Sequence, residues 1–143
     1  MNFIDKILSN LSSMTADDVI QSMTEIYSEP NARNQLLKYP QFIRDIIFIV
    51  DLDTELNMNG DVLENSIKED IHQIIKALRN IKADTDAEIL QQVYNRYLQN
   101  PDDEMIDELY AKMYIYNDLD IWKLLEIYVE REIIEYKNKS PFS

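Results

Sequence analysis

The chain changes character at residues 51–66, which read Asp51-Leu52-Asp53-Thr54-Glu55-Leu56-Asn57-Met58-Asn59-Gly60-Asp61-Val62-Leu63-Glu64-Asn65-Ser66. This stretch closes the most apolar segment of the protein, Phe42 to Leu56, and it contains the only glycine of 143 residues, Gly60. Glycine adopts positive φ angles without penalty and is common just beyond the end of a helix. We therefore expect a helix to end at Asn59-Gly60, a short helical turn at Asp61 to Glu64, and a new helix from Ser66.

Apolar residues recur at helical spacing on both sides of this stretch. Capping-box patterns, which mark helix starts, begin at Thr15, Ser66 and Thr85. Residues 46–50 are rich in β-branched side chains and could form a buried strand, but no other segment reads as its partner. We therefore expect a central helix that is apolar on nearly all sides. The pattern predicts an all-α, single-domain helical bundle over residues 1–143, with about seven helices.

Two helices are expected near the C-terminus. The first has Asp102, Asp103 and Glu104 in its first turn, where negative charge favours the helix dipole, and continues through Met105 to Tyr116. The second runs from Leu119 to Tyr136, and its inward face is expected to carry Leu119, Trp122, Leu125, Tyr128, Val129 and Ile133. The nine tyrosines and Trp122 mostly fall on such core stripes, so we expect buried rings whose hydroxyls reach the surface.

The formal net charge is −13, from 14 lysines and arginines against 27 aspartates and glutamates. Such a surface repels nucleic acid and anionic membranes, and it attracts basic proteins. The alternative is that the acidity serves only solubility. The chain has no cysteine, which excludes disulfides, thiol nucleophiles and thiolate metal sites. No apolar run has the length of a signal-peptide core or of a membrane span, so we expect a cytoplasmic protein.

Sites for metals and catalysis are incomplete in this sequence. Glu69 and His72 form half of a di-iron motif, but His72 is the only histidine. Residues 55–62 resemble the first half of a calcium loop, but Glu55 replaces the usual Asp and Ser66 stands where a bidentate Glu is required. A Ser/His/Asp arrangement would also depend on His72 alone. We expect no catalytic residue, no metal and no cofactor, and therefore no enzyme.

The charge pattern points to a partner-binding surface instead. Carboxylates three or four positions apart on a helix are about 5–6 Å from one another, and phosphates along a nucleic-acid strand have similar spacing. Helical carboxylates can therefore imitate a row of phosphates, although the same pattern also suits a solvated face. The candidate partner-binding residues are Asp102, Asp103, Glu104, Asp107, Glu108, Glu126 and Glu130.

The opening stretch also carries a family resemblance, which extends over about residues 45–136. An acidic pair, an Asn-Gly turn, an Asn-Ser pair and an Ala-Leu…Ile-x-Ala helix follow one another in this order, and they resemble the DNA-mimic protein family. The residues that form the structural turn motif are Asp53, Glu55, Asn57, Asn59, Gly60, Asn65 and Ser66. Three residues depart from the family pattern: Met58, Asp61, and Lys82 where a glycine is usual.

The resemblance implies an acidic helical homodimer, and a member of that family binds a transcription factor by imitating DNA. The preferred hypothesis is an acidic, non-enzymatic interaction protein that binds a basic DNA-binding protein and not nucleic acid itself. The second hypothesis is an immunity-type inhibitor of a basic toxin or nuclease, which would use the same charge. The third is a small hydrolase or a metal-dependent enzyme, which the single histidine and the absence of cysteine disfavour.

Overall fold

The computed structural model describes residues 2–63 and 69–139. These parts form α-helices and 3-10 helices without any strand, which confirms the predicted all-α bundle. In chain order the elements are α1 (Phe3–Ser9), η1 (Leu11–Ser13), α2 (Ala16–Ser22), η2 (Met23–Tyr27), η3 (Pro30–Lys38), α3 (Gln41–Asn59), α4 (Ile71–Asn80), α5 (Asp84–Gln99), α6 (Met105–Tyr110), η5 (Tyr114–Tyr116) and α7 (Ile121–Lys139).

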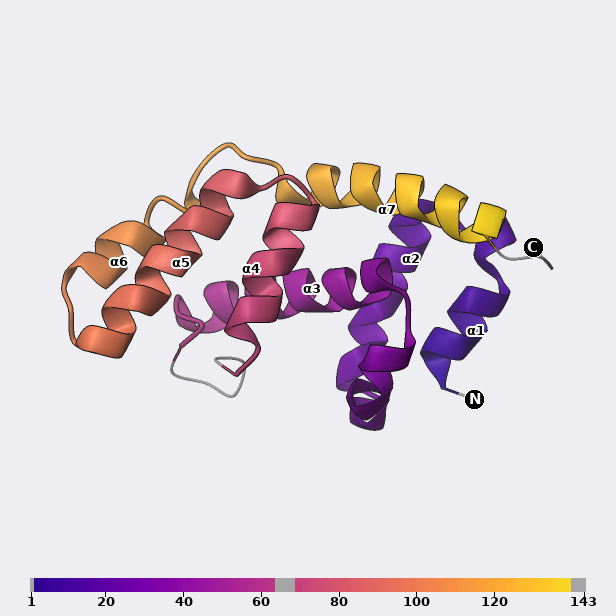
Figure 1. Cartoon of the computed structure of the whole chain (residues 1–143), viewed down its shortest axis with the longest axis horizontal. Helices are drawn as coiled ribbons and strands as arrows, with labels where there is room; N and C mark the ends of the chain where they lie inside the picture. Colours follow the sequence, from indigo (N-terminus) through magenta and orange to yellow (C-terminus); the bar gives the residue numbers. More distant parts are fainter. Residues whose placement is uncertain (1, 64–68, 140–143) are drawn as a thin grey trace.

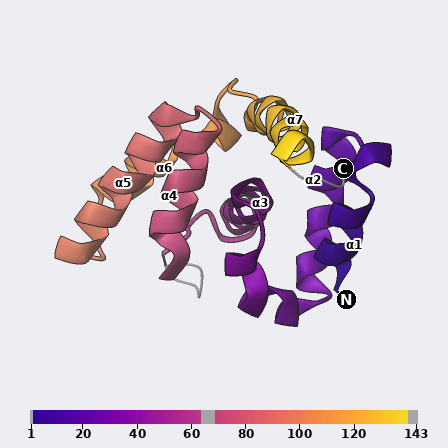
Figure 2. The same cartoon turned by 45° about the vertical axis from the view of Figure 1, so that its right-hand side comes forward.

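Helix α3 is the centre of the fold. Figure 2 shows α3 nearly end-on, with α4, α5 and α6 on one side, α1 and α2 on the other, and α7 above it. α3 packs against α4, η2 and α7, while α5 joins α6 to α4 (Figure 1). Ile43, Ile46, Ile47 and Ile49 are completely buried. The segment that could have been a strand is therefore the core helix, as the sequence predicted.

Gly60 ends α3 as predicted. Its φ is 67° in the left-handed region, and its N–H donates to the Leu56 carbonyl at 3.0 Å. The predicted helical turn that follows is wrong in its described part, residues 61–63, which form no helix. There the Asp61 carboxylate accepts the Leu63 N–H at 2.9 Å and turns the chain locally. Glu64, Asn65 and the predicted helix start at Ser66 lie outside the described residues, and α4 itself begins at Ile71.

A second left-handed residue separates α4 from α5. Lys82 has a φ of 70°, and it occupies the position where the family resemblance leads one to expect glycine. The Ala83 N–H donates back to Leu78 at 2.8 Å and the Lys82 N–H donates to Arg79 at 3.0 Å. These bonds close the end of α4 in the manner of a glycine C-cap. This conformation is unfavourable for a side chain with a Cβ.

Two of the three predicted capping boxes fall on described residues. Thr15 is confirmed, because its hydroxyl accepts the Asp18 N–H at 3.1 Å and the Asp18 carboxylate accepts the Thr15 N–H at 3.0 Å. Thr85 is wrong as a cap. The turn at Lys82 leads directly into α5 at Asp84, so Thr85 already lies inside the helix.

The two C-terminal helices begin later than predicted. α6 starts at Met105, so Asp102, Asp103 and Glu104 all precede it, and it ends at Tyr110 well before Tyr116. α7 starts at Ile121 because the Asp120 carboxylate accepts the Lys123 N–H at 3.1 Å. In this register Leu125, Tyr128, Val129 and Ile133 are buried as predicted, but Leu119 and Trp122 are exposed (41% and 38%), contrary to the predicted inward face.

Candidate partner-binding surface

The acidic residues divide into those used inside the protein and those left on its surface. Asp45, Asp51 and Asp86 are buried, with exposed fractions of 0–2%. Tyr27 and Tyr116 are exposed, contrary to the predicted core packing, but the rings of Tyr39, Tyr110, Tyr114 and Tyr128 are buried as predicted. Their hydroxyls do not point to water, however, because each donates to an aspartate carboxylate. Part of the negative charge therefore holds the fold together and is withdrawn from any partner.

Asp45 lies on α3 where α4 and α7 meet it. Its Oδ1 accepts from Gln41 at 2.8 Å, and its Oδ2 accepts from Asn80 at 3.0 Å and from the Tyr128 hydroxyl at 2.6 Å. The three donors are neutral and come from α3, α4 and α7. A buried carboxylate is tolerated where hydrogen bonds replace its hydration. Asp45 therefore acts as a joint between three helices.

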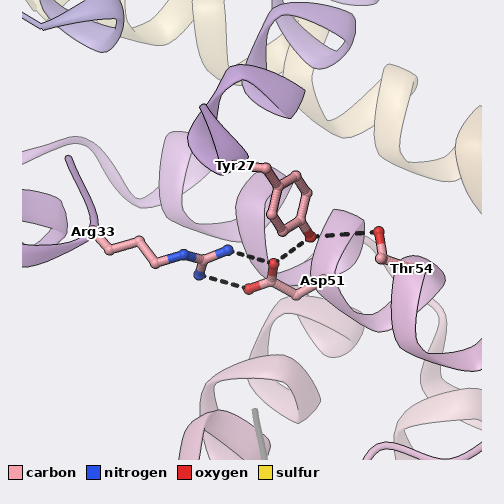
Figure 3. A network of polar contacts seen from close by, with 4 residues as sticks. All are labelled: Tyr27, Arg33, Asp51 and Thr54. Atoms are coloured by element: carbon pink, nitrogen blue, oxygen red, sulfur yellow. Dashed lines mark hydrogen bonds and ion pairs between the residues drawn. The ribbon is translucent and has the colours of Figure 1, made fainter. Parts of the chain in front are cut away.

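Asp51, two turns further along α3, is paired with a cation. The Arg33 guanidinium from η3 makes a bidentate contact with its two oxygens at 2.8 and 2.7 Å (Figure 3). The Tyr27 hydroxyl donates to Oδ1 at 2.7 Å, and it also lies 3.4 Å from Thr54. Burial, together with the neighbouring Asp51, raises the pKa of Tyr27 to about 12. This network ties η2 and η3 to α3, so its charge is balanced internally.

The turn motif is also held by acid–tyrosine pairs. The Tyr114 hydroxyl donates to Asp53 at 2.6 Å, and the Tyr110 hydroxyl donates to Asp61 at 2.6 Å while accepting the Val62 N–H at 3.2 Å. Burial and the adjacent carboxylates raise the pKa of both tyrosines, which keeps them protonated as donors. The turn after α3 is thus attached to the segment that contains α6 and η5.

The asparagines of the motif act within α3. The Asn57 side chain donates to the Asp53 carbonyl at 2.8 Å, and the Asn59 side chain donates to Glu55 Oε2 at 2.8 Å. Gly60 provides the left-handed turn. Asn65 and Ser66 lie outside the described residues. Each described member of the motif therefore makes contacts within the fold.

Asp86 is the buried carboxylate with the poorest environment. It accepts a hydrogen bond from the Tyr114 backbone, but its Oδ2 has no hydrogen-bond partner among the described residues. Burial raises the pKa of Asp86 from 3.8 to about 6. Nothing in its position within a capping-box pattern indicated that this residue would be buried.

The predicted acidic residues near α6 are mostly directed to solvent. Asp102, Glu104, Asp107 and Glu108 are exposed, and none of them forms an ion pair with a described residue. Asp103 differs, because it accepts the Met105 N–H at 2.8 Å and lies 3.1 Å from Arg96. The Met105 N–H and then Arg96 lower the pKa of Asp103. Asp103 therefore helps to start α6, and its four neighbours form the α6 acidic patch.

The other two predicted residues, Glu126 and Glu130, lie on α7. Glu130 is exposed and Glu126 is half-buried. Figure 1 shows α6 at one end of the elongated molecule and most of α7 over the opposite half. The structure therefore does not unite the seven predicted residues in one face. It separates them into the α6 acidic patch and an acidic region along α7.

Glu126 lies in a groove between α2 and α7. The groove has a volume of about 130 Å³, and it is lined by Asp17, Ile20, Gln21, Asp120, Trp122, Lys123 and Glu126. The exposed Trp122 forms part of its wall. This groove was not predicted, because Trp122 was expected in the core. Trp122 fits the apolar spacing of the buried residues of α7, so the sequence carries no signal that would have turned it outward.

A family model described as DMP19-like protein matches residues 37–132, which is more than half of the chain. The chain belongs to the DMP19-like family. This is a family of DNA-mimic proteins and not a known enzyme family. No curated protein and no solved structure matches the chain.

The DMP19-like region contains α3 to α6 and the first two-thirds of α7. It therefore includes the turn motif, the α6 acidic patch, Trp122, Glu126 and Glu130, whereas Asp17 on α2 precedes it. Across residues 2–63 and 69–139, no group of three histidine or acidic residues could hold a metal ion. Over the same residues, no helix has both the length and the apolar character needed to cross a membrane.

Proposed function

We propose that this DMP19-like protein is a non-enzymatic cytoplasmic protein that imitates DNA and thereby binds the basic surface of a DNA-binding protein. The observation that carries the proposal is the α6 acidic patch within a DNA-mimic family. Its four carboxylates are exposed and are not neutralised by any described lysine or arginine. They supply the property that a DNA-binding surface recognises on a phosphate backbone, which is closely spaced negative charge.

The acids that are paired with donors within the fold also support this proposal, because their charge is already accounted for. Asp45, Asp51, Asp53 and Asp61 are occupied by tyrosine, amide or guanidinium donors, so their charge has a structural explanation. The four carboxylates of the α6 acidic patch have no such donor among the described residues, whereas the neighbouring Asp103, outside the patch, accepts the Met105 N–H. Long-range attraction from uncompensated surface charge accelerates association with a basic partner and is screened by salt.

The test is to capture partners of the tagged protein from its native cell at low and at high salt, and then to compete with DNA. We expect a DNA-binding protein that is retained at low salt, released at high salt, and displaced by duplex DNA carrying its binding site. A partner that binds the protein and DNA at the same time would overturn the mimicry. A secreted nuclease or toxin as the retained partner would instead favour the immunity-type inhibitor, which uses the same charge.

The family resemblance also implies a homodimer, and we include this state in the proposal. Two copies would double the charge presented to a partner and could engage two basic sites at once. Light scattering of the purified protein measures its mass in solution directly. A mass of one chain at the concentrations used for partner binding would remove the dimer from the proposal and leave the α6 acidic patch unaffected.

A further inference from the structure

The groove between α2 and α7 combines an exposed aromatic wall with carboxylates from two helices. Trp122 is 38% exposed, although α7 packs directly on α2 beside it. Asp17 lines the groove from the first turn of α2, Asp120 from the residue just before α7, and Glu126 from α7 itself. The groove is small, with a volume of about 130 Å³. The space suits the head group of one side chain and is too small for a helix.

The charges around the groove are unbalanced. Asp17 and Glu126 make no hydrogen bond or ion pair with any described residue, and Asp120 uses one oxygen to accept the Lys123 N–H. Lys123 is the only cation among the lining residues, and its side chain forms no ion pair with a described residue. Three carboxylates against one ammonium leave a net negative groove that is complementary to a cation.

We propose that this groove binds an arginine side chain of the basic partner, with its guanidinium stacked on Trp122 and paired with Asp17 and Glu126. This inference rests on the proposed function and assigns it a specific contact outside the α6 acidic patch. A guanidinium is planar, weakly hydrated and rich in donors, so it stacks on an indole and bonds carboxylates at the same time. A lysine ammonium is strongly hydrated and lacks this flat shape. Tryptophan is also among the residues that dominate binding energy at protein interfaces.

Trp122 is the only tryptophan of the chain, so its fluorescence monitors this groove without an added label. The first experiment titrates the protein with the peptide acetyl-Gly-Arg-Gly-Arg-Gly-amide at low salt and follows tryptophan emission. Peptides with lysine or with uncharged citrulline in place of arginine serve as matched probes. We expect a saturable change with arginine, at least threefold weaker binding with lysine, and no saturation with citrulline. Equal responses to arginine and lysine, or to arginine and citrulline, would overturn the proposal.

The second experiment removes the carboxylates and keeps the reporter. Asp17→Asn with Glu126→Gln should weaken arginine-peptide binding about three- to tenfold, as expected for the loss of two exposed ion pairs. The matched control, Asp107→Asn with Glu108→Gln, removes the same charge from the α6 acidic patch and should leave peptide binding within twofold. Equal losses in both variants would mean that the peptide senses only net charge, which contradicts a specific groove.

The two proposals can fail independently in a competition between the protein and DNA for the captured partner. If the groove variant competes like the wild type while the α6 variant competes poorly, the groove assignment is wrong and DNA mimicry stands. If both variants compete poorly, the arginine contact belongs to the mimic surface, as proposed. Circular dichroism and thermal melting of each variant verify that the fold is intact before binding is compared.

Discussion

The Tyr128 hydroxyl on α7 donates a 2.6 Å hydrogen bond to the carboxylate of Asp45 on α3, and the two residues are 83 positions apart. Gln41 and Asn80 supply the other donors to this carboxylate. None of the described lysines or arginines forms an ion pair with Asp45. Because Asp45 is completely buried and its hydrogen bond with Tyr128 is buried, water cannot replace the Tyr128 hydroxyl without a change in the packing.

Tyr128→Phe should therefore lower the free energy of unfolding by about 1.5–3 kcal/mol, the range for hydrogen bonds to charged groups. Urea unfolding followed by circular dichroism measures the change. Tyr97→Phe is the matched control, because the Tyr97 hydroxyl makes no hydrogen bond with the described residues and its loss should change stability little. Equal effects of the two substitutions would show that Tyr128 contributes only its ring.

Lys82 is strained by its left-handed backbone, so Lys82→Gly should stabilise the protein. Left-handed geometry costs an ordinary residue about 1–2 kcal/mol, and the substitution by glycine relieves this strain. Glycine also loses more chain entropy on folding, which offsets about 0.5–1 kcal/mol of the relieved strain. We expect a net increase of about 0.5–1 kcal/mol in the free energy of unfolding. Lys76→Gly, in the middle of α4, should instead destabilise by about 1 kcal/mol. A loss of stability with Lys82→Gly would contradict the positive φ.

Gly60→Ala should have the opposite sign from Lys82→Gly. A Cβ at Gly60 would meet only the Tyr116 hydroxyl, at 3.9 Å, so the cost comes from the φ of 67° and not from a clash. We expect a loss of about 1 kcal/mol in thermal unfolding. Gly60→Asn should lose less, because asparagine tolerates this region better than alanine. Alanine and asparagine variants of equal stability would remove conformational strain as the explanation.

Asp86 should make stability depend on pH between about 4 and 6. Its pKa is raised from 3.8 to about 6 by burial, so its contribution to stability is fully present below pH 3.8 and is lost as the pH rises through about 6. Asp86→Asn removes this dependence. The free energy of unfolding of the variant minus that of the wild type should therefore rise by about 2 kcal/mol from pH 4 to pH 7. Urea midpoints across that range measure it. Asp84→Asn changes an exposed neighbour and is the control: its plot of urea midpoint against pH should be parallel to that of the wild type. A parallel plot for Asp86→Asn would contradict the assignment.

The α6 acidic patch can be separated from the cap at Asp103 by charge reversal. Asp107→Lys with Glu108→Lys should leave Tm unchanged within error, because both side chains face water without partners. The same pair should slow association with the basic partner and flatten its salt dependence. Asp103→Lys should lower Tm instead, because it removes the acceptor of the Met105 N–H and places a second positive charge beside Arg96. Association as fast as that of the wild type at low salt would show that the Asp107 and Glu108 face is only solvated.

The sequence was sufficient for features that depend on neighbouring residues. The stop at Gly60, the cap at Thr15 and the apolar central helix all follow from local pattern and were predicted correctly. The exposure of Trp122 does not follow from local pattern, because its spacing from Leu125 and Val129 fits the buried stripe of α7. Trp122 lies in the first turn of the helix, where the packing of neighbouring elements decides whether a side chain is covered.

The buried acids could not be predicted, because their partners are far away in the chain. Asp51 is separated from Arg33 by 18 positions and Asp53 from Tyr114 by 61. An aspartate in a helical pattern usually faces water, and only the folded arrangement shows which carboxylate meets a tyrosine. The acidic face was therefore predicted as one set of residues, whereas the structure separates it between α6 and α7 and reserves Asp103 for a cap.

The long separations within the acid–tyrosine pairs also bear on synthesis by the ribosome. Helix α3 is made before any of Tyr110, Tyr114 and Tyr128, so its carboxylates at Asp45 and Asp53 have no hydroxyl donors while the nascent chain emerges. Burying them at that stage would leave charges without those donors. The joint at Asp45 therefore closes only after Tyr128 is available to donate its hydrogen bond.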